Sequence, residues 1–225
     1  MRGTDHIAIS MGSGLLLASP WLLSHPLPVA LFLGGIIIGS LLPDTDATDS
    51  KLHYMDGVAR IFSLIMRPVI MPLTGLFYRV AGKRFNPAHR GSMHTVPGVI
   101  VYSVILAGVI GSALYLSGYY DPIIAFFLIG LFTGGIFHIL EDCCTRSGLM
   151  PLKPYSSRKF AGSINTGDRK EKRPGLYAKG LFGASAAVLI GGHHYHIDGI
   201  VLIALSAGLF LILWLLIFRV SRWGP

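Results

Sequence analysis

Six apolar runs of nearly membrane-spanning length divide this chain and limit the folds that it can adopt. A helix that crosses a bilayer needs roughly 20 mostly apolar residues, so the second and fifth runs are short. With 52% apolar and only 13% charged residues, the composition is too hydrophobic for a soluble domain. We therefore predict an all-α polytopic membrane helical bundle of about six spans, a single domain over residues 1–225, with four spans as the alternative. The runs are Ile7–Leu23, Val29–Leu42, Val96–Leu116, Pro122–Leu140, Leu181–Ile190 and Ile200–Phe218.

The 19 Lys and Arg residues are confined to one side of this predicted topology. Connections 24–28, 117–121 and 191–199 contain none of them, whereas 45–90 and 141–179 contain most. By the positive-inside rule, the basic connections and both termini lie in the cytoplasm, as expected for a multi-pass protein of the inner (cytoplasmic) membrane. The net charge of +8 suits anionic lipid headgroups. Because the charges are not interleaved with aromatic stacking residues, we expect no nucleic-acid partner.

Two long cytoplasmic connections carry most of the polar residues. The first, residues 43–94, contains a segment, 58–80, in which arginines and aromatic residues interrupt an apolar stretch, as in amphipathic helices that lie in the membrane interface. Pro68 and Pro72 should break any single helix there, so a re-entrant hairpin is the alternative. The second connection, residues 142–180, is basic and forms either an ordered cap or a mobile flap. The adjacent Cys143 and Cys144 are expected to be packed, reduced thiols.

Residues with metal-binding side chains recur at the cytoplasmic ends of four different runs. His138 and Asp142 stand four residues apart, so both side chains project from one helical face. An aspartate beside Glu141 at a helix C-terminus is electrostatically unfavourable without a cation. Several such residues at one depth are what a metal site in a bundle core requires; imidazole with carboxylate favours Zn²⁺, with Mn²⁺ or Fe as alternatives and one to three ions. The residues are His6, Asp44 and Asp46, His89 and His94, and His138 and Asp142.

The order of these motifs resembles the YdjM-like family of inner-membrane metal-dependent hydrolases. The matching elements are the N-terminal His6, LPD-x-D at 42–46, HR-x-x-x-H-[ST] at 89–95, and H-x-x-x-D-x-x-T-x-x-G at 138–148. That family is similar in its His and Asp order to the zinc-dependent phospholipase C and single-strand nuclease group, all-helical enzymes with a multi-zinc phosphoesterase site. The resemblance implies that the metal ligands are His6, Asp44, His94, His138 and Asp142. It makes His89 and Asp46 candidates for a further ligand, a residue that orients a ligand, or a general base.

The chemistry expected from such a site is hydrolysis of a phosphoester. Zinc can lower the pKa of bound water to about 7, and two ions can hold the attacking and leaving oxygens. Arg90 could neutralise a phosphate oxygen, so it joins His89 and Asp46 as a catalytic candidate. A site at headgroup depth makes a membrane lipid or a lipid-linked phosphate the natural substrate. The cations that could gather such a headgroup are Arg90, Lys153, Arg158 and Lys159.

Two other functions could use the same residues. A metal or ion transporter would want polar residues deeper within the spans, which are instead almost purely apolar and rich in glycine. A non-catalytic scaffold, in which a metal holds the helix ends together, would need closed coordination. The sequence leaves the substrate, the metal and the oligomeric state open. Glycines that suit close helix packing are Gly34, Gly35 and Gly39 in the second run and Gly130, Gly134 and Gly135 in the fourth.

Overall fold

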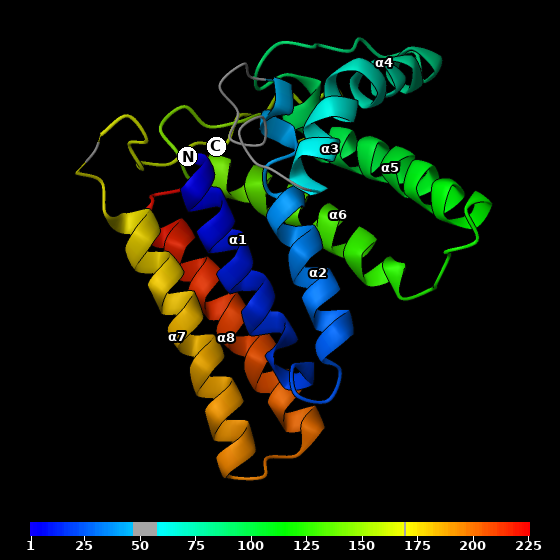
Figure 1. The fold of residues 1–225 in the computed structure, drawn as a ribbon. Helices are drawn as coiled ribbons and strands as arrows, with labels where there is room; N and C mark the ends of the chain where they lie inside the picture. Colours follow the sequence, from blue (N-terminus) through cyan, green and yellow to red (C-terminus); the bar gives the residue numbers. More distant parts are fainter. Residues whose placement is uncertain (47–57, 169) are drawn as a thin grey trace.

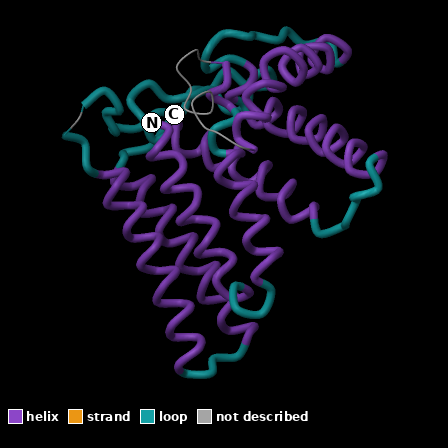
Figure 2. The backbone as a smooth tube through the Cα atoms, viewed as in Figure 1, coloured by secondary structure: helices purple, strands orange, loops and turns teal. Residues whose placement is uncertain are grey.

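A computed structural model describes residues 1–46, 58–168 and 170–225 of the chain (Figure 1). The described residues form helices, turns and loops without any strand, which confirms the predicted all-α bundle (Figure 2). The helices are α1 (Gly3–Ala18), α2 (Pro26–Gly39), α3 (Val58–Ile65), α4 (Met71–Val80), α5 (Val96–Leu116), α6 (Ile124–Cys143), α7 (Arg173–His194) and α8 (Gly199–Val220). Short helical turns between them are η1 (Ser19–Trp21), η2 (Pro43–Asp46), η4 (Met66–Ile70) and η5 (Ser92–His94).

The helices form a bundle with both termini and the basic connections at one end. Figure 1 shows α1, α2, α7 and α8 side by side, while α5 and α6 tilt away from them and α4 lies beyond α5. Both termini lie at the same end as the connection between α4 and α5 and the described part of the connection between α6 and α7 (Figure 2). The three connections without Lys or Arg are short and lie away from this end. The structure thus groups the basic connections on one side, as the charge pattern predicts.

Five helical stretches within the described residues are long and apolar enough to cross a membrane, and the apolar α2 is shorter. The helix of the fifth predicted span is longer than its apolar run: α7 has 22 residues, because it begins at Arg173, well before the apolar stretch starts at Leu181. Hydropathy detects only the apolar part of such a helix. The first predicted run is also divided, since α1 ends at Ala18 and Pro20, which lacks an N–H, lies in η1. The five stretches are Arg60–Val80, Val96–Leu116, Ile124–Cys143, Arg173–His194 and Gly199–Val220.

The helix α8 turns its polar side chains inward and its apolar ones outward. Ser206 is buried and donates a hydrogen bond to the carbonyl oxygen of Leu16 in α1. Trp214 donates from Nε1 to Ser13 Oγ at 3.2 Å. Leucine and isoleucine side chains on the opposite face are exposed, among them Leu211, Ile212 and Leu215. A large exposed apolar face would be unstable in water, so this polarity indicates that lipid surrounds the helix.

The segment 58–80 is helical throughout, so the prediction that its prolines would break the helix was wrong. Pro68 lies in the π-helical turn η4, and Pro72 lies in the first turn of α4. A π turn shifts the hydrogen-bond pattern by one residue, which lets the chain pass a residue that cannot donate. The stretch from Arg60 is long enough to cross a membrane, and its location in the interface stays a prediction.

Glycines bring α2 and α6 into backbone contact. A Cβ atom added at Gly35 would lie 2.1 Å from the carbonyl oxygen of Phe127, and one at Gly39 would lie 2.2 Å from that of Leu131. From the other side, a Cβ at Gly130 or Gly134 would lie 2.1 or 2.4 Å from a carbonyl oxygen of α2. Real side chains do not approach so closely, so only glycine fits at these four positions. The close packing predicted for the glycines is confirmed at these four positions and was wrong for Gly34, where no atom lies within 4 Å of an added Cβ.

The described part of the connection between α6 and α7 folds back on itself as an ordered cap. Arg146 donates its N–H to the carbonyl oxygen of Ile164 at 3.0 Å, and Leu149 pairs with Phe160 in a short antiparallel bridge. Gly148 has a φ of +57°, and a Cβ there would lie 2.3 Å from the Phe160 carbonyl oxygen, which explains the need for glycine. The neighbouring Cys143 and Cys144 are buried free thiols, as predicted.

Candidate functional site

The five residues predicted to bind metal come together at the end of the bundle that carries both termini. Four of them are at most 1% exposed, and the fifth, Asp44, has a side chain that is 20% exposed. Their ligand atoms form two groups, within each of which all atoms lie within 4.8 Å of one another. His138 belongs to both groups. One group is His6, His138 and Asp142, and the other is Asp44, His94 and His138.

Two motif threonines hold the helix ends that carry these residues. Thr95 caps α5, since its hydroxyl accepts from the N–H of Gly98 at 3.0 Å. Thr145 donates from Oγ1 to the carbonyl oxygen of Asp142 at 2.7 Å. This bond gives a partner to one of the carbonyl groups in the last turn of α6. The motif threonines beside the candidate ligands therefore fix the backbone from which His94 and Asp142 project.

The ring of His138 is oriented by the backbone of α2. Its Nδ1 donates to the carbonyl oxygen of Ser40 at 2.7 Å, so in the neutral ring Nε2 carries the lone pair. That Nε2 lies 3.6 Å from Asp44 Oδ1 and 3.8 Å from Asp142 Oδ2, and it has no hydrogen-bond partner among the described residues. Since Ser40 follows Gly39 directly, the close approach of α2 and α6 places this carbonyl beside the imidazole.

His6 is held in the same way by a buried carboxylate. Its Nδ1 lies 2.5 Å from Glu141 Oε2, and Ser10 donates to Glu141 Oε1 at 2.8 Å. A carboxylate that accepts from Nδ1 leaves the lone pair of the neutral ring on Nε2, which lies 3.5 Å from Asp142 Oδ1. The rings of His6 and His138 stack with centroids 4.0 Å apart. Two imidazoles thus direct lone pairs toward the same carboxylate.

This donor set fits a metal ion. The ligands of a tetrahedral zinc ion with bonds of about 2.1 Å lie about 3.5 Å apart. The separations of 3.5 Å between His6 and Asp142 and of 3.6 Å between His138 and Asp44 match that value. Buried polar atoms normally find partners, yet Nε2 of His6 and of His138 have none within the described ranges. Because one nitrogen of His138 serves both groups, the groups meet at a shared position.

Asp44 forms the more open edge of the cluster. Its Oδ1 lies 3.1 Å from Nε2 of His94, whose ring is fully buried. Burial would raise the pKa of the Asp44 carboxyl, but His138 and the hydrogen bond from His94 outweigh it and hold this pKa below its ordinary value. Asp44 therefore stays ionised at neutral pH, as a metal ligand must be.

Cationic groups and a further imidazole lie against the cluster. Arg90 places Nη2 3.4 Å from Asp142 Oδ2, and the amino group of Met1 donates to Asp142 Oδ1 at 2.8 Å. Arg90 has a φ of +60°, which is rare for a residue with a side chain. The exposed His89 packs its ring against His94 with centroids 5.1 Å apart. Both predicted catalytic residues with a described side chain therefore border the cluster.

The other predicted site residues are not gathered there. Lys153, Arg158 and Lys159 are exposed on the connection after α6, and no contact joins them to the cluster within the described chain. Arg158 instead lies over the ring of Phe160, 5.5 Å from its centroid. Asp46 closes η2, but its side chain lies outside the described residues.

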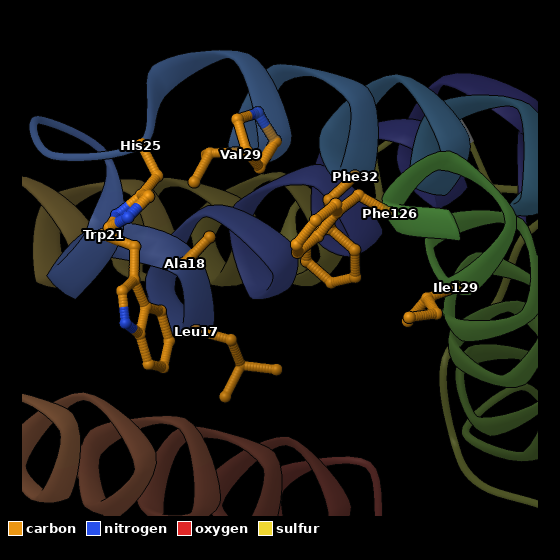
Figure 3. A pocket seen from close by; sticks show the side chains of 9 residues that line it. Leu17, Ala18, Trp21, His25, Val29, Phe32, Phe126 and Ile129 are labelled. Carbon is orange, nitrogen blue, oxygen red and sulfur yellow. The ribbon is translucent and has the colours of Figure 1, made fainter. Parts of the chain in front are cut away.

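A hydrophobic cavity between α1, α2 and α6 lacks the groups for chemistry. It has a volume of about 480 Å³ and is lined by Leu17, Trp21, Val29 and Phe32 among others (Figure 3). Its one titratable side chain is His25, whose Nδ1 lies 2.9 Å from Ser24 Oγ. None of the cluster residues lines this cavity, so the cluster is the candidate site.

Comparison with known families agrees with the order of the motifs. A family model described as YdjM inner membrane protein matches residues 1–222. The chain belongs to this family. Neither the curated proteins nor the solved structures include a match. Membership of the YdjM family supports a multi-pass protein of the inner membrane, in agreement with the several apolar helices.

The residues that orient the candidate ligands were not predicted from the sequence. Glu141 entered only as an unfavourable charge beside Asp142, whereas it is buried and bonded to His6. Ser10 stands four residues after His6 in α1, so its place on the same helical face was a usable signal. The role of Ser40 rests on a backbone carbonyl, for which no sequence signal exists in this YdjM family member.

Replacing Glu141 by glutamine should weaken zinc binding by about 10- to 100-fold, the usual effect of losing a residue that orients a metal-bound histidine. The amide keeps the shape but loses the charge that fixes the proton on Nδ1 of His6. Zinc affinity measured by competition with a coloured chelator would show this. Glu171→Gln is the matched control, since Glu171 pairs with Arg173 away from the cluster and should leave the affinity unchanged. Equal zinc affinities in the two variants would show that Glu141 does not contribute to zinc binding.

Proposed function

We propose that this chain is a membrane-embedded, metal-dependent hydrolase that cleaves a phosphoester of a lipid or of a lipid-linked substrate. The observation that carries the proposal is the pair of buried Nε2 atoms, from His6 and His138, that face Asp142 without hydrogen-bond partners in the described chain. Asp44 and His94 complete the set of residues that would hold zinc, with manganese or iron as alternatives. A bound zinc ion would activate water and stabilise negative charge on phosphoester oxygens.

The residues at the open edge have roles that fit this reaction. Arg90 is 26% exposed and already lies near a carboxylate oxygen, so its guanidinium can bind a phosphate oxygen of the substrate. His89 is exposed beside His94 and can accept a proton at its imidazole. Lys153, Arg158 and Lys159 on the neighbouring connection would attract an anionic headgroup without touching the cluster.

The location of the cluster indicates where the substrate comes from. The cluster lies at the end of the bundle that carries the basic connections and both termini. With that end in the cytoplasm, as the positive-inside rule predicts, the site lies at the depth of the headgroups of the inner leaflet. A phosphoester of a membrane lipid reaches this depth without leaving the bilayer.

The test is release of soluble phosphate compounds from phospholipids in mixed micelles by the purified protein. We expect zinc-dependent release that a chelator abolishes and that His94→Ala and Asp142→Ala reduce to background, because each variant removes a ligand. Asp121→Asn, at an exposed carboxylate in the connection between α5 and α6, should keep full activity.

The competing function is a scaffold in which a metal joins the helix ends. The convergence of α1, η2, η5 and α6 on one cluster favours it as much as it favours catalysis. A protein that carries its full complement of metal, yet releases no phosphate compound from any phosphoester lipid tested, would be a scaffold and would contradict the hydrolase.

A further inference from the structure

A second polar site lies on α4 and the loop that follows it, and none of its lining residues belongs to the candidate metal cluster. A groove of about 710 Å³ opens between this helix and residues 83–87. Its wall is fixed, because the ring of Phe85 packs edge-on against that of Tyr78 with centroids 5.6 Å apart. Tyr78 is buried and its hydroxyl lies 3.1 Å from Thr95 Oγ1. The groove is thus a built feature of the fold, and neither the proposed metal chemistry nor the family match accounts for it.

Three cations line this groove and no described carboxylate balances them. Arg79, Lys83 and Arg84 are exposed, and none of them forms an ion pair with an acidic residue of the described chain. Lys83 also lies over the ring of Tyr155, 5.2 Å from its centroid, so the connection after α6 lies beside the groove. Three positive charges around one hollow create a potential that attracts an anion.

The remaining walls of the groove are apolar and continue onto a lipid-facing surface. Met71, Gly75 and Leu76 of α4 line it together with Phe85. Leu76 is 50% exposed, and the neighbouring Phe77 and Val80 are 54% and 80% exposed. Large apolar side chains exposed in this way on a membrane protein face acyl chains. A cationic rim beside such a face fits a molecule with an anionic head and an apolar tail.

We propose that this groove binds an anionic phospholipid of the surrounding membrane, with the headgroup phosphate between Arg79, Lys83 and Arg84 and an acyl chain along Leu76 and Phe77. The site is distinct from the proposed hydrolase and does not need its metal. The lipid would anchor α4 at the membrane surface on the side where the basic connections lie.

The experiment is lipid binding to the full chain, measured by native mass spectrometry in detergent after chelator treatment. Phosphatidylglycerol and phosphatidylcholine with the same acyl chains are the probes, and we expect about tenfold tighter binding of the anionic lipid. The triple variant Arg79→Ala, Lys83→Ala, Arg84→Ala should lose this preference. The triple variant Lys170→Ala, Lys172→Ala, Lys179→Ala removes the same charge from sites elsewhere in the chain and should keep it. Elution as a monodisperse peak on size exclusion shows that each variant is folded.

A second variant tests whether the lipid occupies the groove, without changing the charge of the protein. A Cβ atom added at Gly75 would lie 3.3 Å from the ring of Phe85, so Gly75→Leu should fill the groove and weaken phosphatidylglycerol binding. Equal binding of the two lipids by the wild type, or equal losses in the two triple variants, would overturn the proposal. Full displacement of phosphatidylglycerol by inorganic phosphate would also overturn it, because the groove would then be a site for free anions. The use of metal-stripped protein separates these outcomes from failure of the hydrolase.

Discussion

Alanine at His138 should leave the purified protein without bound metal. His138 offers the single nitrogen shared by both ligand groups, so its loss removes a ligand from each. The wild type, purified in detergent under metal-replete conditions, should carry at least one equivalent of zinc or manganese by elemental mass spectrometry. We expect His138→Ala to retain less than about a tenth of it, because the loss of one of three or four ligands commonly costs well over tenfold in affinity.

Two further variants locate the metal within the cluster. Asp142→Ala removes a ligand from the group with His6, and Asp44→Ala removes one from the group with His94. Loss of all metal in both variants would mean that the groups form one site, whereas partial loss in each would mean two ions. The matched control is His25→Ala, because this exposed histidine at the start of α2 lies beside Ser24, away from the cluster, and should not alter metal content.

Both the hydrolase and the metal scaffold would be contradicted if the folded wild type stayed free of metal after incubation with excess zinc. The buried carboxylate of Asp142 would then be balanced by Arg90 and by the amino group of Met1. Such a result would not affect the proposal that the groove binds a lipid, since that proposal rests on α4 and not on the cluster.

Much of the candidate site could be predicted because membrane helices limit where polar residues can lie. A histidine and an aspartate four residues apart at the end of an apolar run must share one face and one depth, so the pairing of His138 with Asp142 followed from spacing alone. His6 and Asp44 lie at the same predicted depth on other runs. The structure brings all of these residues together, whereas their chemistry stays a prediction.

The parts that could not be predicted depend on backbone geometry or on polar helix turns. The start of α7 was missed because Arg173 to Lys179 are helical without being apolar. The helix through Pro68 was missed because proline normally breaks a helix, whereas here a π turn accommodates it. The bond from His138 to the Ser40 carbonyl has no side-chain signature at Ser40. Sequence patterns thus located the candidate ligands and missed the groups that orient them.

Replacing Gly35 by alanine should lower the thermal stability of the protein strongly, whereas the same change at the adjacent Gly34 should not. A Cβ at Gly35 would lie 2.1 Å from the Phe127 carbonyl oxygen and 3.0 Å from the Gly130 Cα atom, so α2 and α6 must move apart. Overpacking of this kind typically costs about 1–3 kcal/mol, and backbone atoms cannot turn aside as a flexible side chain can. At Gly34 no atom lies within 4 Å of the added Cβ, and alanine favours the helix.

The measurement is the melting temperature of each variant in the same detergent, followed by zinc affinity at a temperature where both are folded. Gly34→Ala should melt at or slightly above the wild-type temperature, and Gly35→Ala several degrees below it. The second readout tests the link to the site: moving α2 away from α6 lengthens the bond between Ser40 and His138 that aims Nε2 at the carboxylates. Gly35→Ala should therefore bind zinc more weakly even where it is folded. Equal melting temperatures would contradict the backbone contact, whereas a lower melting temperature with unchanged zinc affinity would show that the helix contact and the orientation of His138 are independent.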